Sequence, residues 1–171
     1  MTRVTLLGLV ASLFVATGCG PTEPAPPVEP GEEAVSCAPT PGAPPSAERE
    51  LTIGRLEDGA FVPVSDGDSI PLIFGSQGGH MIMPVVDLPS SGEAGVCARV
   101  RLEHGPDDAP VAPGLAAYIL LEPVGDRLRS GALRDLLGYD SGELEGLELQ
   151  LEMFVDAPTF TAYQSVDIIV D

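Results

Sequence analysis

Alternation of apolar and polar residues constrains this chain more than any other feature of its sequence. Within residues 96–103 the apolar positions are Val96, Ala98, Val100 and Leu102, and the positions between them are Cys97, Arg99, Arg101 and Glu103. The same period of two recurs in residues 147–156 and in residues 160–170. Successive side chains of a β-strand point to opposite faces of its sheet, so the pattern predicts strands with one buried face.

Turn residues separate the apolar segments of residues 48–171 at intervals of about 8–12 residues. Asp58-Gly59 predicts a tight hairpin turn, and Asp66-Gly67-Asp68 predicts a second turn. Short strands with such spacing predict an all-β domain. We expect a two-sheet antiparallel β-sandwich of the immunoglobulin-like kind.

Three segments of this domain carry individual expectations. Residues 80–88 predict one strand, and the apolar residues 115–124 predict a strand buried on both faces. Residues 127–139 are compatible with either a short helix or a crossover connection.

The N-terminal residues have the layout of an export signal. Arg3 supplies a positive charge, and residues 4–16 form an apolar stretch shorter than the ~20 residues that a membrane-spanning helix needs. Residues 16–19 read Ala-Thr-Gly-Cys, which resembles the lipobox of bacterial lipoproteins. The resemblance implies removal of a signal peptide, residues 1–18, and lipidation of Cys19. The alternatives are an ordinary secretory signal cleaved near Gly18 and an uncleaved anchor.

This resemblance also implies a location. A lipid-anchored chain is expected in the bacterial cell envelope, attached to the membrane through its N-terminal lipid. Proteobacterial lipoproteins that stay in the inner membrane carry Asp after the cysteine, and this chain has Gly20 there. We therefore expect the outer membrane. Residues 19–47 follow the signal and are rich in Pro, Glu, Ala and Gly, which predicts a disordered tether between the lipidated cysteine and the domain.

Two cysteines, Cys37 and Cys97, remain once Cys19 is assigned to the lipid. In an exported protein, one remaining pair most simply forms a disulfide bond. Because Cys97 lies on the polar side of its alternating segment, the bond would attach the end of the tether to the outside of a sheet. Two free thiols are the alternative.

Residues 66–88 contain the best candidate for a chemical site. Gly78-Gly79-His80-Met81-Ile82-Met83 resembles a segment of periplasmic copper chaperones of the PCuAC type, which are small β-sandwiches that bind Cu(I) through His and Met. The resemblance implies His80, Met81 and Met83 as metal ligands, although the chain lacks the further upstream ligands of that family. Strand alternation would place His80 and Ile82 on one side, and Met81 and Met83 on the other.

The alternative interpretation of the same stretch is structural. Gln77, Gly78 and Gly79 would form a backbone turn, after which His80 opens a central strand. The stretch also resembles segments of uncharacterised lipoproteins of GC-rich bacteria, and this resemblance implies no activity. A further alternative is a calcium site with oxygen ligands from Asp66 and Asp68, or from Asp107 and Asp108.

The charge balance bears on partners. The chain has 26 acidic residues against 8 basic ones, all of them Arg, and a net charge of −18. Such a charge opposes binding to nucleic acid. Motifs for a serine nucleophile, a zinc protease or a phosphate loop are missing from the sequence, so we expect no enzyme.

The sequence therefore favours a membrane-tethered, non-enzymatic binding module with a protein or envelope partner. Phe154 and Tyr163, on the polar sides of their segments, are candidates for its exposed face. We expect no cofactor for this function. The alternative function is copper binding or delivery through His80, Met81 and Met83, and a hydrolase ranks third.

Overall fold

The computed structural model describes residues 33–38, 45–75, 79–105, 112–137 and 144–171. The expected signal peptide, Cys19, Gln77, Gly78, and the calcium candidates Asp107 and Asp108 lie outside these residues. All regular elements in the described ranges are strands: β1 (Ala47–Glu50), β2 (Thr52–Glu57), β3 (Ala60–Pro63), β4 (Asp68–Ile70), β5 (Ile73–Phe74), β6 (His80–Ile82), β7 (Val85–Pro89), β8 (Val96–Gly105), β9 (Ala112–Val124), β10 (Arg127–Arg129), β11 (Asp135–Leu137), β12 (Glu148–Asp156) and β13 (Phe160–Val170).

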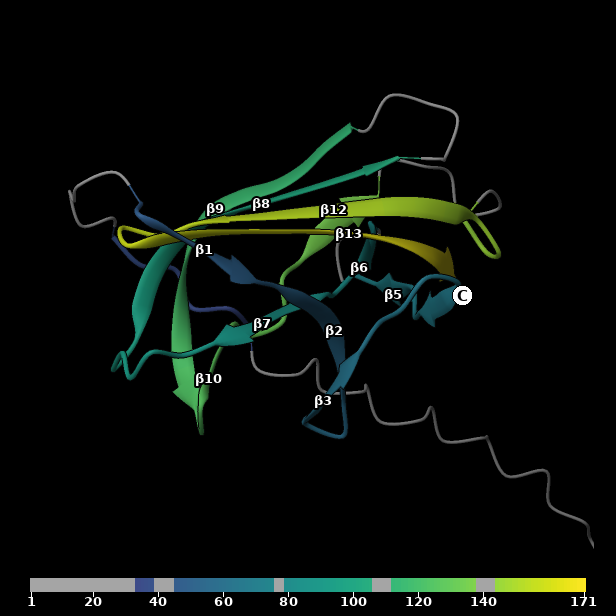
Figure 1. Cartoon of the computed structure of the whole chain (residues 1–171). Helices are drawn as coiled ribbons and strands as arrows, with labels where there is room; N and C mark the ends of the chain where they lie inside the picture. Colours follow the sequence, from purple (N-terminus) through teal and green to yellow (C-terminus); the bar gives the residue numbers. More distant parts are fainter. Residues whose placement is uncertain (1–32, 39–44, 76–78, 106–111, 138–143) are drawn as a thin grey trace, which may run out of the picture.

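The strands form two facing layers, which confirms the expected all-β sandwich (Figure 1). One layer has the order β1-β13-β12-β8-β9, and the other continues as β10-β7-β2-β3. The long strand β9 belongs to both layers because it pairs with β8 along most of its length and with β10 at its end. On the opposite side the chain passes from β1 directly into β2, so both edges of the sandwich are bridged by continuous backbone.

A smaller sheet of three strands, in the order β11-β6-β5, lies beside the two layers. Most strand pairs are antiparallel, but β1 and β4 both pair in parallel with β13. β1 and β4 pair with opposite ends of the same edge of β13, so neither pairs with the middle of that edge. The Ile53 amide donates there to the Gln164 side chain at 2.5 Å.

The alternating segments behave as the sequence predicts. In β8, the side chains of Ala98, Val100 and Leu102 are fully buried, whereas Arg99 is exposed and Arg101 is half-buried. The neighbouring strands β12 and β13 bury every second residue in the same way. Their buried side chains are Leu149, Leu151, Met153, Val155, Val166, Ile168 and Val170. Burial of these residues removes apolar surface from water, and it forms the main core between the layers.

The first hairpin turn also has the predicted form. Asp58 and Gly59 both have positive φ, 51° and 77°. A two-residue turn with positive φ at both positions matches the right-handed twist of its flanking strands. The turn therefore fixes the register of β2 against β3, in which Glu57 is aligned with Ala60.

The expected single strand of residues 80–88 is wrong, because the segment divides into β6 and β7. The break falls at Met83-Pro84, and the two strands belong to different sheets. Proline has no amide hydrogen to donate to a ladder, so it favours the end of a strand. The Pro84 carbonyl instead accepts a hydrogen bond from the Leu133 amide at 2.9 Å.

Residues 127–137 form two strands rather than a helix. Leu128 is buried between half-buried neighbours in β10, and exposed Leu136 lies between buried Asp135 and Leu137 in β11. The burial pattern therefore has a period of two here. Leu128 pairs with β7, and Leu136 and Leu137 pair with β6, whereas Leu133 lies in the connection between the two strands.

Strand β9 is buried on one face only, contrary to the expectation for residues 115–124. Ile119 and Leu121 point into the core, whereas Tyr118 is 40 % exposed. The outer edge of β9 instead receives residues 35–37: the Cys37 amide donates to the Tyr118 carbonyl, and the Leu120 amide donates to the Val35 carbonyl. Residues 33–37 thus contact the domain, within the segment expected to be a tether.

Candidate functional site

The stretch of residues 66–88 is spread over two layers and the small sheet. The side chains of Asp66 and Asp68 accept hydrogen bonds at the turn that precedes β4. The Asp66 carboxylate accepts a hydrogen bond from the Asp167 amide at 3.1 Å, and Asp68 accepts one from the Ser65 amide at 2.9 Å. Both carboxylates are therefore occupied by backbone amides, as expected of turn-forming aspartates.

His80 lies in β6 opposite Phe74 of β5 and Leu137 of β11. The ring of Phe74 meets the imidazole edge-on, with the ring centroids 4.6 Å apart and an interplanar angle of 89°. Leu137 is buried, and Phe74 is 68 % exposed. His80 thus lies at the edge of the sandwich, packed against an aromatic ring. Gly79, just before it, accepts a hydrogen bond through its carbonyl from the Gly75 amide at 2.8 Å.

Met81 points to the opposite face of β6 from His80, as strand alternation predicts. It is aligned with Ile73 and Leu136 and packs against the small apolar cluster that contains Met83, Val85 and Ala132. Met83 belongs to this cluster and Met81 packs against it, whereas His80 points to the other face of β6. The geometry of β6 therefore does not bring His80, Met81 and Met83 together as one ligand set.

The described ranges contain no group of three or more His, Cys, Asp or Glu side chains that could hold a metal ion. Thioether ligands fall outside that set, so the copper hypothesis depends on the placement of the two methionines given above. Met81 fits closely against the turn: a Cβ atom added to Gly75 would lie 2.7 Å from its terminal methyl carbon. Methionine commonly fills irregular gaps of this kind in apolar clusters.

Cys37 and Cys97 form the predicted disulfide bond, with their Cα atoms 5.9 Å apart. Cys97 is aligned with Leu120 of β9, and Cys37 lies beside Tyr118, so the bond joins the residue 33–38 segment to the outside of the first layer. This is the position that the polar-side location of Cys97 predicts.

The sequence interpretation missed a buried pair formed by His104 and Asp135. The Nδ1 atom of His104 lies 2.8 Å from Oδ2 of Asp135, and both side chains are buried. Nδ1 of His104 and both carboxylate oxygens of Asp135 have no hydrogen-bond partner among the described residues, so the two side chains are joined by close polar contact alone. His104 continues the inward phase of the β8 alternation, which is a signal the sequence did contain. Its partner lies in a different sheet and could not be read from spacing.

Gly114 makes room for this pair. Strand β9 carries a bulge opposite Leu102, because Arg101 is aligned with Ala116 while Glu103 is aligned with Pro113. A Cβ atom on Gly114 would lie 2.1 Å from Oδ1 of Asp135. Only glycine allows the backbone to approach the carboxylate this closely.

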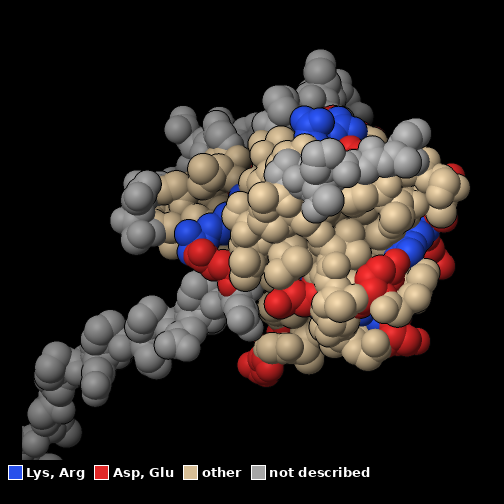
Figure 2. All heavy atoms as spheres, turned by 90° about the vertical axis from the view of Figure 1, so that its left-hand side faces the viewer, with Lys and Arg blue, Asp and Glu red and all other residues tan. Residues whose placement is uncertain are grey.

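Several arginines are held by ion pairs within the domain. Asp87 is buried and accepts hydrogen bonds from Nε of Arg127 at 2.7 Å and Nε of Arg129 at 2.8 Å. Arg49 lies over the ring of Phe160 and pairs with Glu93. The pairing with Arg49 holds the pKa of Glu93 at about 2. Figure 2 shows one face of the molecule, on which Arg side chains in blue lie next to Asp and Glu side chains in red.

The outer face of the first layer carries an aromatic pair. The ring centroids of Phe154 and Tyr163 lie 4.8 Å apart, and the guanidinium of Arg101 lies 4.4 Å from the Phe154 centroid. Tyr163 is 48 % exposed, and its hydroxyl donates to Glu152 at 2.9 Å. Partial burial and the neighbouring Glu152 carboxylate raise the pKa of the Tyr163 hydroxyl. The sequence correctly assigned both rings to the outside of their strands.

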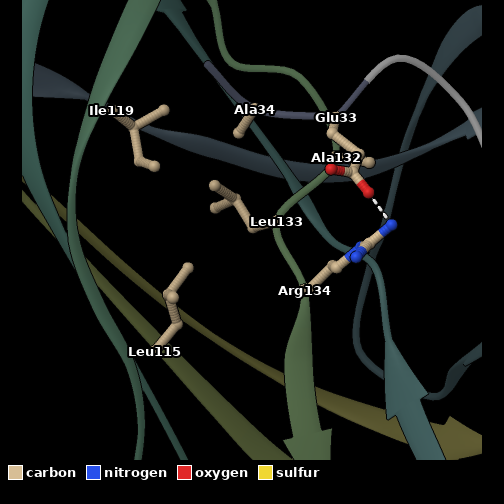
Figure 3. Close-up of a pocket in the computed structure, with 7 residues that line it drawn as sticks. All are labelled: Glu33, Ala34, Leu115, Ile119, Ala132, Leu133 and Arg134. Atoms are coloured by element: carbon tan, nitrogen blue, oxygen red, sulfur yellow. Dashed lines mark ion pairs between the residues drawn. The ribbon is translucent and has the colours of Figure 1, made fainter. Parts of the chain in front are cut away.

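A cavity of about 150 Å³ lies where the residue 33–38 segment meets β9 (Figure 3). Figure 3 shows Leu133 pointing toward Ile119 and Leu115, with Glu33 and Arg134 paired at one side. Ligand pockets commonly have volumes of roughly 300–1,000 Å³. This cavity is therefore too small for a drug-sized substrate, and its other lining residues, Ala34 and Ala132, add no reactive group.

Comparison of the chain with protein-family models, curated proteins and solved structures found no match. Within the ranges that the structure describes, no helix is long and apolar enough to cross a membrane.

Proposed function

We propose that this protein is a membrane-tethered, non-enzymatic lipoprotein whose β-sandwich acts as a binding module of the bacterial cell envelope. The observation that carries the proposal is the aromatic pair of Phe154 and Tyr163 on the outer face of the first layer. Tyrosine at 48 % exposure beside a second ring offers a large, rigid contact area. Such aromatic side chains are enriched at protein interfaces.

The N-terminal sequence supports the tethered part of the proposal. Residues 16–19 resemble a lipobox, and lipidation of Cys19 would anchor the chain in the envelope, with the outer membrane as the proposed location. Multiple acyl chains give stable anchoring, because each buried methylene contributes about 0.8 kcal/mol. The Cys37–Cys97 bond and the pairing of Glu33 with Ala132 would then hold the end of the tether against the domain.

Two features of the described residues support binding over catalysis. His104 is buried and directed at Asp135, which places it away from the aromatic face. The small cavity beside β9 has an apolar lining apart from the Glu33–Arg134 pair. A binding module needs neither a reactive side chain nor a deep cleft, and its contacts can spread over a sheet face.

The test uses the full chain in bacterial cells, with a photo-crosslinking amino acid at position 163 and, as a matched control, at position 58. Asp58 is an exposed hairpin residue in the other layer. We expect membrane association that Cys19→Ser abolishes, together with a discrete crosslinked adduct from position 163 alone. Equal adducts from both positions, or unchanged membrane association of Cys19→Ser, would contradict the proposal.

A further inference from the structure

A row of five aligned residues crosses the outer face of the first layer. Tyr163 is aligned with Glu50 of β1 on one side and with Phe154 of β12 on the other, and Phe154 is in turn aligned with Arg101 of β8. Arg101 is aligned with Ala116 of β9. Side chains at aligned positions share a face of the sheet. Glu50, Tyr163, Phe154, Arg101 and Ala116 therefore form one continuous strip, which we name the outer strip.

The outer strip already accommodates one guanidinium group. Arg101 lies over the Phe154 ring, 4.4 Å from its centroid, and pairs with Glu103 at 3.2 Å. This combines a cation–π contact with an ion pair. The exposed Tyr163 ring has acidic neighbours of the same kind, because Glu50 is aligned with it and Glu152 accepts its hydroxyl hydrogen bond. Tyr163 thus presents a second ring bordered by carboxylates.

The charge of this face is strongly negative. Besides the strip itself, strand alternation brings further charged side chains to the same side. The acidic ones on this face are Glu48, Glu50, Glu103, Glu148, Glu152, Asp156 and Asp167, and the basic ones are Arg99 and Arg101. Arg101 is paired within the domain. The face therefore attracts cations and repels anionic lipid and nucleic acid.

We propose that the outer strip binds an arginine-bearing basic segment of a protein partner, with the partner's guanidinium on the Tyr163 ring between Glu50 and Glu152. This inference rests on the proposed binding function and names the chemistry of its partner. Arginine is favoured over lysine because its planar guanidinium stacks on an aromatic ring and pairs with carboxylates in a fixed geometry. In this arrangement the partner's guanidinium would stack on the Tyr163 ring, as the Arg101 guanidinium stacks on the Phe154 ring.

The test measures binding of the full chain, purified from membranes in a non-ionic detergent, to fluorescent peptides by anisotropy. The peptides are short repeats of Arg-Ser, Lys-Ser and Glu-Ser. We expect the Arg-Ser peptide to bind about 5-fold more tightly than the Lys-Ser peptide, and the Glu-Ser peptide not to bind. Binding is expected to weaken as salt is added, because Glu50 is exposed to solvent and Glu152 is only half-buried.

Variants of the strip separate stacking from general charge. Tyr163→Ser is expected to weaken Arg-Ser binding about 5-fold, whereas Tyr163→Phe keeps the ring and changes binding less than about 2-fold. Glu50→Gln with Glu152→Gln is expected to weaken binding about 5-fold or more. The matched control is Asp58→Asn with Asp126→Asn, which removes the same charge from two exposed hairpin turns of the other layer.

Failure of the inference can be told apart from failure of the binding function. Equal loss of affinity in the control pair, equal binding of the Arg-Ser and Lys-Ser peptides, or absence of binding would overturn the basic-segment inference. In each of those cases a crosslinked adduct from position 163 in cells would still support the binding function with a partner of different chemistry. If that adduct were absent as well, both the basic-segment inference and the proposed binding function would be contradicted.

Discussion

At the scale of single residues, the His104–Asp135 pair is the most demanding feature of the core. Asp135 is fully buried, and Nδ1 of His104 lies 2.8 Å from its Oδ2 atom. A carboxylate in such a place must be compensated, because burial of an unpaired charge is costly. The pair also joins two sheets, since His104 belongs to β8 and Asp135 to β11.

We expect His104→Ala to lower the free energy of unfolding by about 3–5 kcal/mol, because it leaves Asp135 buried without its partner. Urea denaturation of the purified chain measures this loss. Glu103→Gln is the control, since Glu103 is the half-buried neighbour on the outer face and is expected to change stability by less than about 1 kcal/mol. A loss from His104→Ala no larger than that of the control would show that the pair contributes little.

Copper binding also depends on the placement of single residues. Because Met81 and Met83 pack in an apolar cluster while His80 lies on the other face of β6, we expect no stoichiometric copper in the exported, purified chain. Elemental analysis of protein prepared without chelator checks this expectation. Stoichiometric copper that disappears in His80→Ala would revive the copper hypothesis and require these side chains to rearrange.

At the scale of elements, the loop between β7 and β8 is fastened to β1. Arg49 donates to the Pro89 carbonyl at 3.0 Å and to Ser91 at 3.0 Å, and it pairs with Glu93. Glu93 in turn accepts hydrogen bonds from Ser90 and from the Ser91 amide. These contacts explain why a loop of six residues follows a fixed path between two layers.

This network predicts a pH dependence of stability. The pKa of Glu93 falls from 4.5 to about 2 in the folded chain, chiefly through Arg49. Because the folded pKa is the lower one, the stabilisation is complete above pH 4.5 and is lost as the pH falls toward 2. Screening by water limits the effect to about 1 kcal/mol. Unfolding free energies measured across this window for the parent chain and Glu93→Gln should converge at low pH; parallel curves would contradict the assignment.

At the scale of the whole molecule, the disulfide bond decides where the N-terminal segment joins the domain. It links residues 60 positions apart and lies next to the pairing of residues 35–37 with β9. Closing a loop of this length restricts the unfolded chain, which the chain-entropy model values at about 4 kcal/mol, although measured effects are often smaller.

We expect the Cys37→Ala/Cys97→Ala double variant to be less stable by about 2–4 kcal/mol. The comparison uses urea denaturation of the parent chain with and without a reducing agent, and reduction should have no effect on the variant. Intact mass of the parent chain should be lower by two hydrogens than that of its reduced form. A parent chain with two free thiols, or a variant of unchanged stability, would contradict the structural assignment.

The sequence by itself determined the local features of this protein. The period-two patterns of residues 96–103 and 147–156 identified strands and their buried faces, since side-chain alternation is a property of the strand itself. Asp58-Gly59 identified its turn because positive φ is a local backbone requirement. The prediction that Cys19 carries the lipid left Cys37 and Cys97 as the expected disulfide pair, which the structure contains. Strand alternation placed His80 and Met81 on opposite faces.

Only the tertiary structure decided the features that depend on distant partners. The division of residues 80–88 at Met83-Pro84 follows from pairing with two different sheets. The exposed face of β9 could not be read from its apolar residues, because burial depends on what covers a strand. The contact between His104 and Asp135 joins strands of two different sheets. The outer strip depends on the register of five strands. Such juxtapositions depend on the packing of segments far apart in sequence, and no local period encodes them.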